Sequence, residues 1–227
     1  MATSHLAGPA TRNLDHPAFR VARSSSLLSH SHIAAGDAAL PNAGNRFDVY
    51  GGGVLYLASD VRGCYAETLA RFRPTAKIRD LVDGENGFMV CGGVPADWRN
   101  NRMIASVECR SALPFVDVEA VETHEFLTAA MARELSALGV DTLDVGLIRG
   151  RNRLITRAVA SWAYAAVDPS TGAPLYSGIR YVSRLSDYEC WAVFDGTDVE
   201  ETGNRRTINL GDPDLVKIES AFGLRVF

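Results

Sequence analysis

The stretch from Asn45 to Arg73 holds the residue types best suited to chemistry in this chain. Arg46 is followed by three glycines, an apolar run and a segment of helix formers that carries a single glutamate, Glu67. In a helix, Glu67 lies two residues before Leu69 and three after Cys64, so its side chain borders the apolar stripe. A carboxylate in such a place needs a cationic or hydrogen-bonding partner. The stretch therefore predicts a functional site as well as scaffold.

The elements that would position these residues follow from local patterns. Val54–Ala58 is a short β-favouring run, and Asp60 has the residue type of an N-cap for a helix from Val61 to Phe72. The three glycines precede a strand, which indicates a tight turn and not a phosphate-binding loop. An ordinary alternative exists for Glu67, because it could pair with Arg71 one turn later on an exposed helix face.

The rest of the chain alternates between strand-like and helix-like patterns. We expect further strands at Pro17–Ala22, Met89–Val94, Met103–Glu108, Pro114–Val118, Gly178–Val182 and Cys190–Phe194. We expect further helices at 123–138 (capped by Thr123 and stopped by Gly139), at Arg153–Ala166 with Trp162 in the core, and at Asp214–Gly223. Ser24–Asn45 has no clear period and predicts a long loop. Together these patterns predict one α+β domain over residues 16–227, with a mixed or split sheet and flanking helices, after a loose leader at 1–15.

Composition limits the classes of partner. The chain has 227 residues, 47% of them hydrophobic, and a formal net charge of −4. This charge argues against nucleic acid as a direct partner, since such proteins usually present a basic face. No apolar run approaches the roughly 20 residues of a membrane-spanning helix. The four cysteines are scattered, and His30 and His32 lack partners at metal-ligand spacing, so we expect a soluble cytoplasmic protein with reduced thiols and no metal.

Five segments, taken in order, resemble the RES domain, a family named for its Arg, Glu and Ser positions. The segments are AFRVAR (18–23), NRFDVYGGGVLYLASD (45–60), CYAETLARF (64–72), RNRLITRAVASWA (151–163) and YSGIRYVSRLSDYECWAVF (176–194). Known members look like ADP-ribosyltransferase-type folds that degrade NAD, and many are toxins held inactive by a cognate antitoxin. The resemblance thus implies that fold, NAD as substrate and an antitoxin as partner.

The resemblance assigns the family's site to Arg20, Arg46, Tyr56, Glu67 and Ser183. Two guanidinium groups can grip the phosphates of NAD or an inorganic phosphate bidentately. Cleavage of the nicotinamide bond builds positive charge on the ribose, which Glu67 can stabilise. The Tyr56 ring could stack on nicotinamide or sugar, and the Ser183 hydroxyl could hydrogen-bond the ribose or carboxamide. The resemblance permits either phosphate or water as the attacking group.

Several alternatives stay open at the level of sequence. The two arginines could be surface residues, Tyr56 a core aromatic and Ser183 a turn residue. Arg180 is a secondary candidate, because it lies close to Ser183. The chain could instead be a mono-ADP-ribosyltransferase that modifies a protein, or a non-catalytic binding module with the same fold. A homo-oligomer is also compatible with the sequence.

Overall fold

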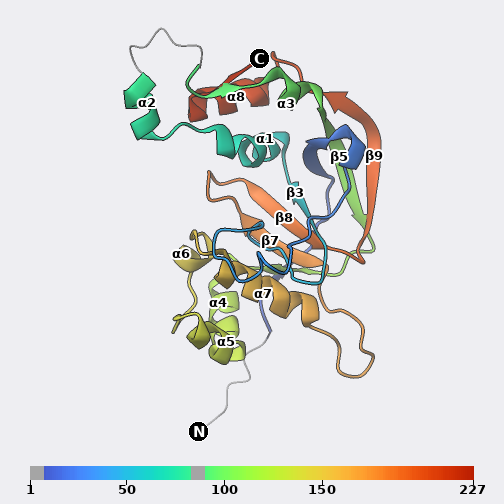
Figure 1. The fold of residues 1–227 in the computed structure, drawn as a ribbon. Helices are drawn as coiled ribbons and strands as arrows, with labels where there is room; N and C mark the ends of the chain where they lie inside the picture. Colours follow the sequence, from blue (N-terminus) through green and yellow to red (C-terminus); the bar gives the residue numbers. More distant parts are fainter. Residues whose placement is uncertain (1–7, 83–89) are drawn as a thin grey trace.

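An eight-stranded mixed sheet runs through the molecule in the order β1-β6-β7-β8-β3-β2-β5-β9. Among these strands, Figure 1 labels β3, β5, β7, β8 and β9. The computed structural model describes residues 8–82 and 90–227. The strands are β1 Thr11–Arg12, β2 Ala18–Arg23, β3 Val54–Ala58, β5 Arg102–Arg110, β6 Phe115–Asp117, β7 Gly178–Val182, β8 Glu189–Phe194 and β9 Asp198–Thr207. Strands β6 and β7 are parallel, and all other neighbours in this sheet are antiparallel. The expected α+β class with a mixed sheet is confirmed.

The helices form two groups, which Figure 1 shows at opposite ends of the molecule. One group holds α1 Val61–Leu69, α2 Ala76–Val82, α3 Ala96–Asn100 and α8 Pro213–Phe222, beside the parallel pair of β4 Gly93–Val94 and β10 Arg225–Val226. The other holds α4 Val121–Ala130, α5 Ala132–Ala137, α6 Val145–Ile148 and α7 Arg153–Ala165. Helix α1 contacts β2 and β3, whereas α7 contacts β7. Within the described residues, no helix is long and apolar enough to cross a bilayer.

Strand alternation separates two cores on the two faces of the sheet. Val54 and Ala58 of β3 join the core that includes side chains of both helix groups. Leu55 and Leu57 point to the opposite face, where they pack in a second core with Trp191. Because successive side chains of a strand face opposite sides, Tyr56 shares the helix-covered face with Val54 and Ala58. The two helix groups therefore cover one face of the sheet, and the space between them can expose β3 side chains.

Most of the expected elements are confirmed. Strands β3 and β7 have the expected bounds, and α7 and α8 each differ by a residue or two at their ends. The Asp60 side chain caps α1 by accepting a hydrogen bond from the backbone N–H of Gly63 at 2.6 Å. The expected strand at 89–94 is reduced to β4, with Met89 outside the described residues. Residues 1–7 of the expected leader are also outside them, and Thr11–Arg12 of that segment pairs with β6.

The predicted single helix at 123–138 is wrong in two respects. The first helix begins at Val121 and its N-cap is Ala120, so Thr123 lies inside the first turn. The Thr123 hydroxyl instead accepts a hydrogen bond from the backbone N–H of Ala10, 113 residues away, at 3.0 Å. At Met131 the backbone leaves helical geometry, and α5 follows as a separate short helix. A contact so distant in sequence could not be read from local capping rules.

Candidate functional site

A cleft of about 280 Å³ opens between the two helix groups. Among residues 8–82 and 90–227, four arginines and a single carboxylate line it, and we call it the arginine cleft. Its walls come from β2, β3, α1, the segment before β3, the start of α7, β7, β8 and the loop after β7. The lining residues are Arg20, Val21, Ala22, Asn45, Arg46, Tyr56, Leu57, Ala58, Gly63, Cys64, Glu67, Thr68, Arg153, Tyr181, Arg184 and Cys190. Four of the five residues expected at the site thus line one cleft.

Glu67 of α1 is exposed to the cleft and is held by the fifth expected residue, Ser183. The Ser183 hydroxyl donates a hydrogen bond to Glu67 Oε1 at 2.6 Å and accepts one from the backbone N–H of Leu185 at 3.1 Å. Ser183 itself is only 1% exposed. Among the described residues, no ion pair joins Glu67 to Arg71, whose guanidinium lies over the Phe72 ring. The buried serine therefore fixes one oxygen of an exposed carboxylate.

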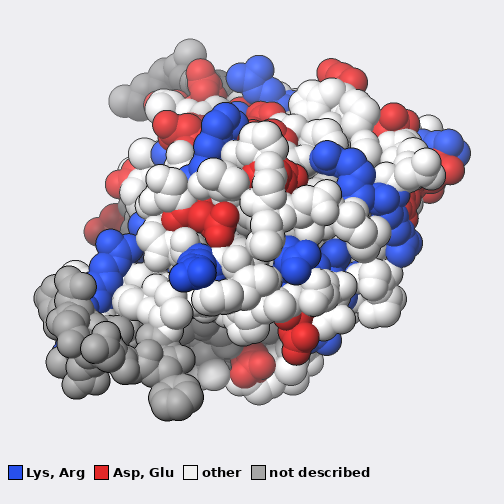
Figure 2. All heavy atoms as spheres, turned by 90° about the horizontal axis from the view of Figure 1, so that it is seen from above, with Lys and Arg blue, Asp and Glu red and all other residues white. Residues whose placement is uncertain are grey.

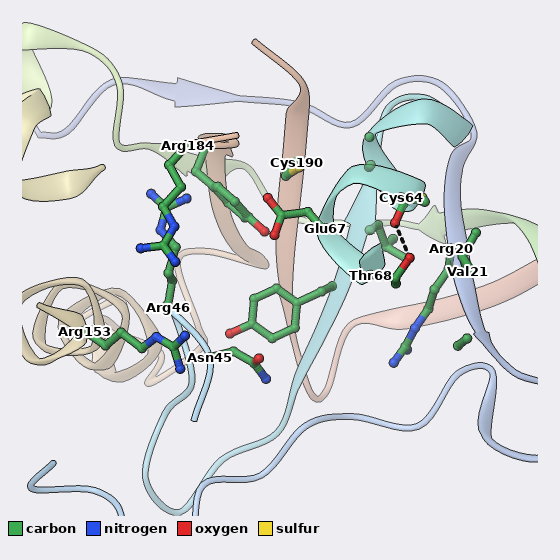
Figure 3. A pocket seen from close by; sticks show the side chains of 16 residues that line it. Arg20, Val21, Asn45, Arg46, Cys64, Glu67, Thr68, Arg153, Arg184 and Cys190 are labelled. Carbon is green, nitrogen blue, oxygen red and sulfur yellow. Dashed lines mark hydrogen bonds between the residues drawn. The ribbon is translucent and has the colours of Figure 1, made fainter. Parts of the chain in front are cut away.

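Arg20 reaches the cleft from β2, on one side of Glu67 (Figure 3). Its Nη2 donates to the backbone oxygen of Ser29 at 3.0 Å, while its buried Nη1 has no hydrogen-bond partner among the described residues. Burial lowers the pKa of Arg20 to about 10. A half-buried guanidinium that lines a cleft favours an anion beside it, because its charge is only partly solvated.

Arg46 lies on the other side of Glu67 (Figure 3). Its Nη2 donates to the backbone oxygen of Ile148 at 2.9 Å and its Nη1 to that of Val182 at 3.3 Å. The guanidinium carbon also lies 4.9 Å from the centre of the Tyr181 ring, a cation–π contact. Neutral carbonyls and an aromatic face orient the side chain without neutralising it, so its charge stays available to a ligand.

Two further arginines, Arg153 and Arg184, stand beside Arg46 in the same wall (Figure 3). Arg153 opens α7 and donates to the backbone oxygens of Asn42, at 3.0 Å, and Gly44. Arg184 is exposed, and its pKa is lowered by desolvation first and then by the charges of Arg46 and Arg153. Four positive charges thus face the single negative charge of Glu67. This excess of positive charge favours anions in the cleft.

The sequence alone assigns no role to Arg153 or Arg184. Arg153 lies inside one of the segments that resemble the RES domain, and Arg184 directly follows the expected Ser183. Their position next to Arg46 arises from the packing of α7 and the loop after β7, which no local pattern reveals. The density of arginines in those two segments is the only signal that sequence offers.

The ring of Tyr56 lines the cleft, while its hydroxyl bonds to residues that do not line the cleft. The hydroxyl donates to Asp48 Oδ1 at 2.9 Å and accepts from the backbone N–H of Phe47 at 3.1 Å. Burial, and then the charge of Asp48, raises the pKa of Tyr56 well above its ordinary value. The hydroxyl therefore stays protonated and engaged, which leaves the ring as the part of Tyr56 that can meet a ligand.

Side chains of helix α7 hydrogen-bond to the backbone of residues 38–46, the segment that leads to Arg46. Arg157 is 6% exposed and donates to three backbone oxygens of that segment, those of Ala38, Leu40 and Ala43, at 3.2, 2.6 and 2.7 Å. The Thr156 hydroxyl donates to the backbone oxygen of Arg46. The long expected loop is therefore tied to a helix just before it enters the cleft.

The glycine turn that follows is sterically required. Gly51 has a φ of +83°, in the region that favours glycine. A Cβ on Gly52 would lie 2.8 Å from the Tyr164 ring, and one on Gly53 would lie 2.8 Å from the His32 ring. The triple glycine thus lets the chain turn tightly into β3, as the sequence indicated.

Arg180, the secondary candidate, does not line the cleft. It donates to Glu189 Oε1 at 2.8 Å and to Asp117 Oδ1 at 3.2 Å. Its neighbour Tyr181 lines the cleft instead, because alternate residues of β7 face opposite sides of the sheet. Arg180 is therefore a structural ion-pair residue.

Two thiols in the cleft wall, Cys64 and Cys190, are poor nucleophiles. Burial raises the pKa of Cys64 to about 12 and also raises that of Cys190. Since the thiolate is the reactive form, burial disfavours both thiols as nucleophiles. In the parts of the chain that the structure describes, no group of three metal-ligand side chains gathers, and the expectation of no metal stays a prediction.

The charge distribution outside the cleft is mixed. Figure 2 shows Lys and Arg side chains interspersed with Asp and Glu over one face of the molecule. Positive and negative side chains are mixed on that face, whereas arginines predominate in the cleft.

Comparison with known proteins places these residues in a family. The sequence model of the RES domain matches residues 17–210, a range that contains every residue lining the arginine cleft. No curated protein is significantly similar to the chain in sequence. A solved structure that aligns with it is the crystal structure of the M. tuberculosis MbcT–MbcA toxin–antitoxin complex. The identity is 10%, the TM-score 0.49, and the alignment covers 94% of this chain and 92% of the other.

Proposed function

The chain belongs to the RES-domain family, and we propose that its arginine cleft binds NAD and cleaves the bond between nicotinamide and ribose. One observation carries the proposal: Glu67, the only carboxylate that lines the cleft among the described residues, is held by Ser183 and lies between arginines on both sides (Figure 3). A dinucleotide needs cations for its phosphates and a carboxylate beside its ribose. Both requirements meet within this one cleft.

The arginines supply the binding energy in this proposal. Guanidinium groups match the oxygens of a phosphate bidentately. Arg46 is oriented for this role by its two carbonyl contacts, and Arg153 and Arg184 stand beside it. Arg20 lines the opposite side of the cleft, where the backbone oxygen of Ser29 holds its Nη2. Phosphate groups can therefore be gripped on either side of the carboxylate.

Glu67 supplies the chemistry. When the carbon–nitrogen bond breaks, both of its electrons leave with nicotinamide, and the ribose develops positive charge at the anomeric carbon. The negative charge of Glu67 stabilises that charge, and the Ser183 hydroxyl holds the carboxylate in one orientation. We therefore assign Ser183 to positioning Glu67, in place of a direct contact with the sugar or the carboxamide. The Tyr56 ring packs against the sugar or nicotinamide.

An oxygen of inorganic phosphate or of water then bonds to the anomeric carbon in place of nicotinamide, which gives ADP-ribose 1″-phosphate or ADP-ribose. When water attacks, it releases one proton to the solvent. Four arginines exceed the charge of one pyrophosphate group, and this excess favours phosphate as a second anion in the cleft. The proposal is thus an NAD phosphorylase, with a glycohydrolase as the alternative in which water attacks.

Incubating the purified chain with NAD, with and without inorganic phosphate, and resolving the products by mass spectrometry tests this function. Phosphate-dependent loss of NAD with ADP-ribose phosphate as product would support the phosphorylase, and phosphate-independent loss would support the glycohydrolase. Labelling of an added protein with little free product would support a mono-ADP-ribosyltransferase. No turnover and no labelling would reject the enzymatic proposal and favour a binding module.

Membership of this family also suggests a protein partner. We propose that a cognate antitoxin covers the mouth of the arginine cleft and so prevents access of NAD, which keeps the chain from depleting NAD in the cell. Binding of NAD to the isolated chain and to its complex with the antitoxin would be compared by calorimetry. An antitoxin that inhibits turnover while NAD binds equally well would contradict this mode of inhibition.

A further inference from the structure

Asp48 is a buried carboxylate that gathers hydrogen-bond donors from three separate segments. It is 1% exposed. Its Oδ1 accepts from the Tyr56 hydroxyl of β3 at 2.9 Å, and its Oδ2 accepts from the backbone N–H of Asn45 at 2.7 Å and from the Ser31 hydroxyl at 3.3 Å. The Asn45 side chain also donates to Oδ1, at 3.4 Å. All these donors are neutral, and within the described residues Asp48 takes part in no ion pair.

This arrangement requires a carboxylate and not its amide. Donors converge on both oxygens, so both must be acceptors. An asparagine keeps one oxygen and puts an NH₂ group in place of the other. In one orientation the NH₂ group faces the backbone N–H of Asn45. In the other it faces the side-chain N–H of Asn45 and removes the acceptor of the Tyr56 hydroxyl, so either orientation loses a hydrogen bond. The contacts thus distinguish Asp48 from a residue that only fills space.

The contacts of Asp48 lie on both sides of Arg46 along the chain. On one side, the backbone N–H of Asn45 donates to Asp48 directly. On the other, the backbone N–H of Phe47 donates to the Tyr56 hydroxyl, which in turn donates to Asp48. Asp48 therefore helps to fix both the backbone at Arg46 and the position of the Tyr56 ring. Asp48 itself does not line the arginine cleft.

We propose that Asp48 is a positioning residue for the arginine cleft, which fixes the turn carrying Arg46 and the ring of Tyr56 for ligand binding. The test of this inference by KM and kcat rests on the proposed function, whereas its test by ADP binding does not. Losing Asp48 displaces the base of Arg46, whose far end is tied to Ile148 and Val182. Asp48→Asn should therefore weaken anion binding before it affects the chemistry of Glu67.

The test compares Asp48→Asn with a matched control, Asp212→Asn. Asp212 also accepts a hydrogen bond from a tyrosine hydroxyl, that of Tyr65 at 3.1 Å, and it caps α8 outside the cleft. Both variants lose one acceptor of an Asp–Tyr pair, so both should lower the melting temperature. Binding of ADP is measured by calorimetry, and KM and kcat are measured with NAD.

We expect Asp48→Asn to raise the Kd of ADP about tenfold, comparable to the loss of one hydrogen bond to a charged group. KM for NAD should rise by a similar factor with a smaller change in kcat, while Asp212→Asn leaves all three constants unchanged. In a Tyr56→Phe background, Asp48→Asn should have a smaller effect on ADP binding, because Asp48 acts partly through that hydroxyl. If Asp48→Asn does not fold, Tyr56→Phe alone should weaken ADP binding.

The outcomes separate this inference from the proposed function. If the wild-type chain binds ADP but does not consume NAD, the proposed function fails and the ADP data alone decide the role of Asp48. If the wild-type chain does both and the two Asp→Asn variants bind ADP equally, the positioning role is wrong. A wild-type chain that neither binds ADP nor consumes NAD would overturn both.

Discussion

Ser183→Ala removes the hydroxyl that holds the proposed catalytic carboxylate. The variant loses the 2.6 Å hydrogen bond to Glu67 Oε1 and leaves the backbone N–H of Leu185 without its acceptor. A hydrogen bond to a charged group contributes about 1.5–3 kcal/mol. Because Glu67 is exposed, water replaces part of that contact and the lower end applies. Each 1.4 kcal/mol of lost transition-state stabilisation is about tenfold in rate, so we expect kcat to fall about tenfold with little change in KM.

Steady-state NAD consumption gives kcat and KM, and thermal unfolding gives the change in stability. Ser177→Ala is a matched control, since Ser177 is also buried and its hydroxyl accepts from the backbone N–H of Leu113 at 2.8 Å, outside the cleft. Ser177→Ala should lose about 1 kcal/mol of unfolding free energy, and Ser183→Ala about 2 kcal/mol, because it also loses the bond to a charged group. Equal kcat values for the two variants would refute the idea that Ser183 acts through Glu67.

Three further changes test the parts around the carboxylate. Arg46→Lys should raise KM for NAD about tenfold, because lysine cannot keep the two carbonyl contacts and the Tyr181 stacking; an unchanged KM would argue against this clamp. Arg157→Gln removes the donors of three backbone oxygens in the loop before Arg46, so it should lower the free energy of unfolding, measured by thermal unfolding, by about 3 kcal/mol. Hydrogen bonds from Ser170 and Thr171 lower the pKa of Asp168 to about 2. Because this pKa is lower in the folded state, ionised Asp168 stabilises the fold above pH 3.8, and that stabilisation is lost as the pH falls toward 2. Over this range the melting temperature of Asp168→Asn should therefore fall less than that of the wild-type chain.

The sequence predicts most of the fold, because the elements around the cleft carry strong local patterns. Val54–Ala58 and Gly178–Val182 are dense in β-favouring residues, and their expected bounds match the structure. Strand β9 was not predicted. Its sequence, DVEETGNRRT, is polar because β9 lies at the edge of the sheet with most residues exposed or half-buried. A strand without a buried face leaves no alternating pattern to detect.

The candidate site is predicted less completely. The resemblance to the RES domain indicates Arg20, Arg46, Tyr56, Glu67 and Ser183, and the structure brings these residues together, although their roles stay predictions. The contact between Ser183 and Glu67 spans 116 residues of sequence. Local patterns cannot reveal such a pairing. The same limit applies to the arginines of α7 and of the loop after β7, which reach the cleft through tertiary packing.

The most direct test of the central claim is nicotinamide release from NAD by the wild-type chain and by Glu67→Gln, at NAD concentrations that saturate both. The amide keeps the size of the side chain and removes the negative charge, so NAD should still bind while the chemical step slows. We expect wild type to release nicotinamide and Glu67→Gln to release it at least 100-fold more slowly, on the order of one lost electrostatic contact to a transition state. Equal rates for the two folded proteins would contradict the account, because the charge of Glu67 would then have no part in breaking the bond.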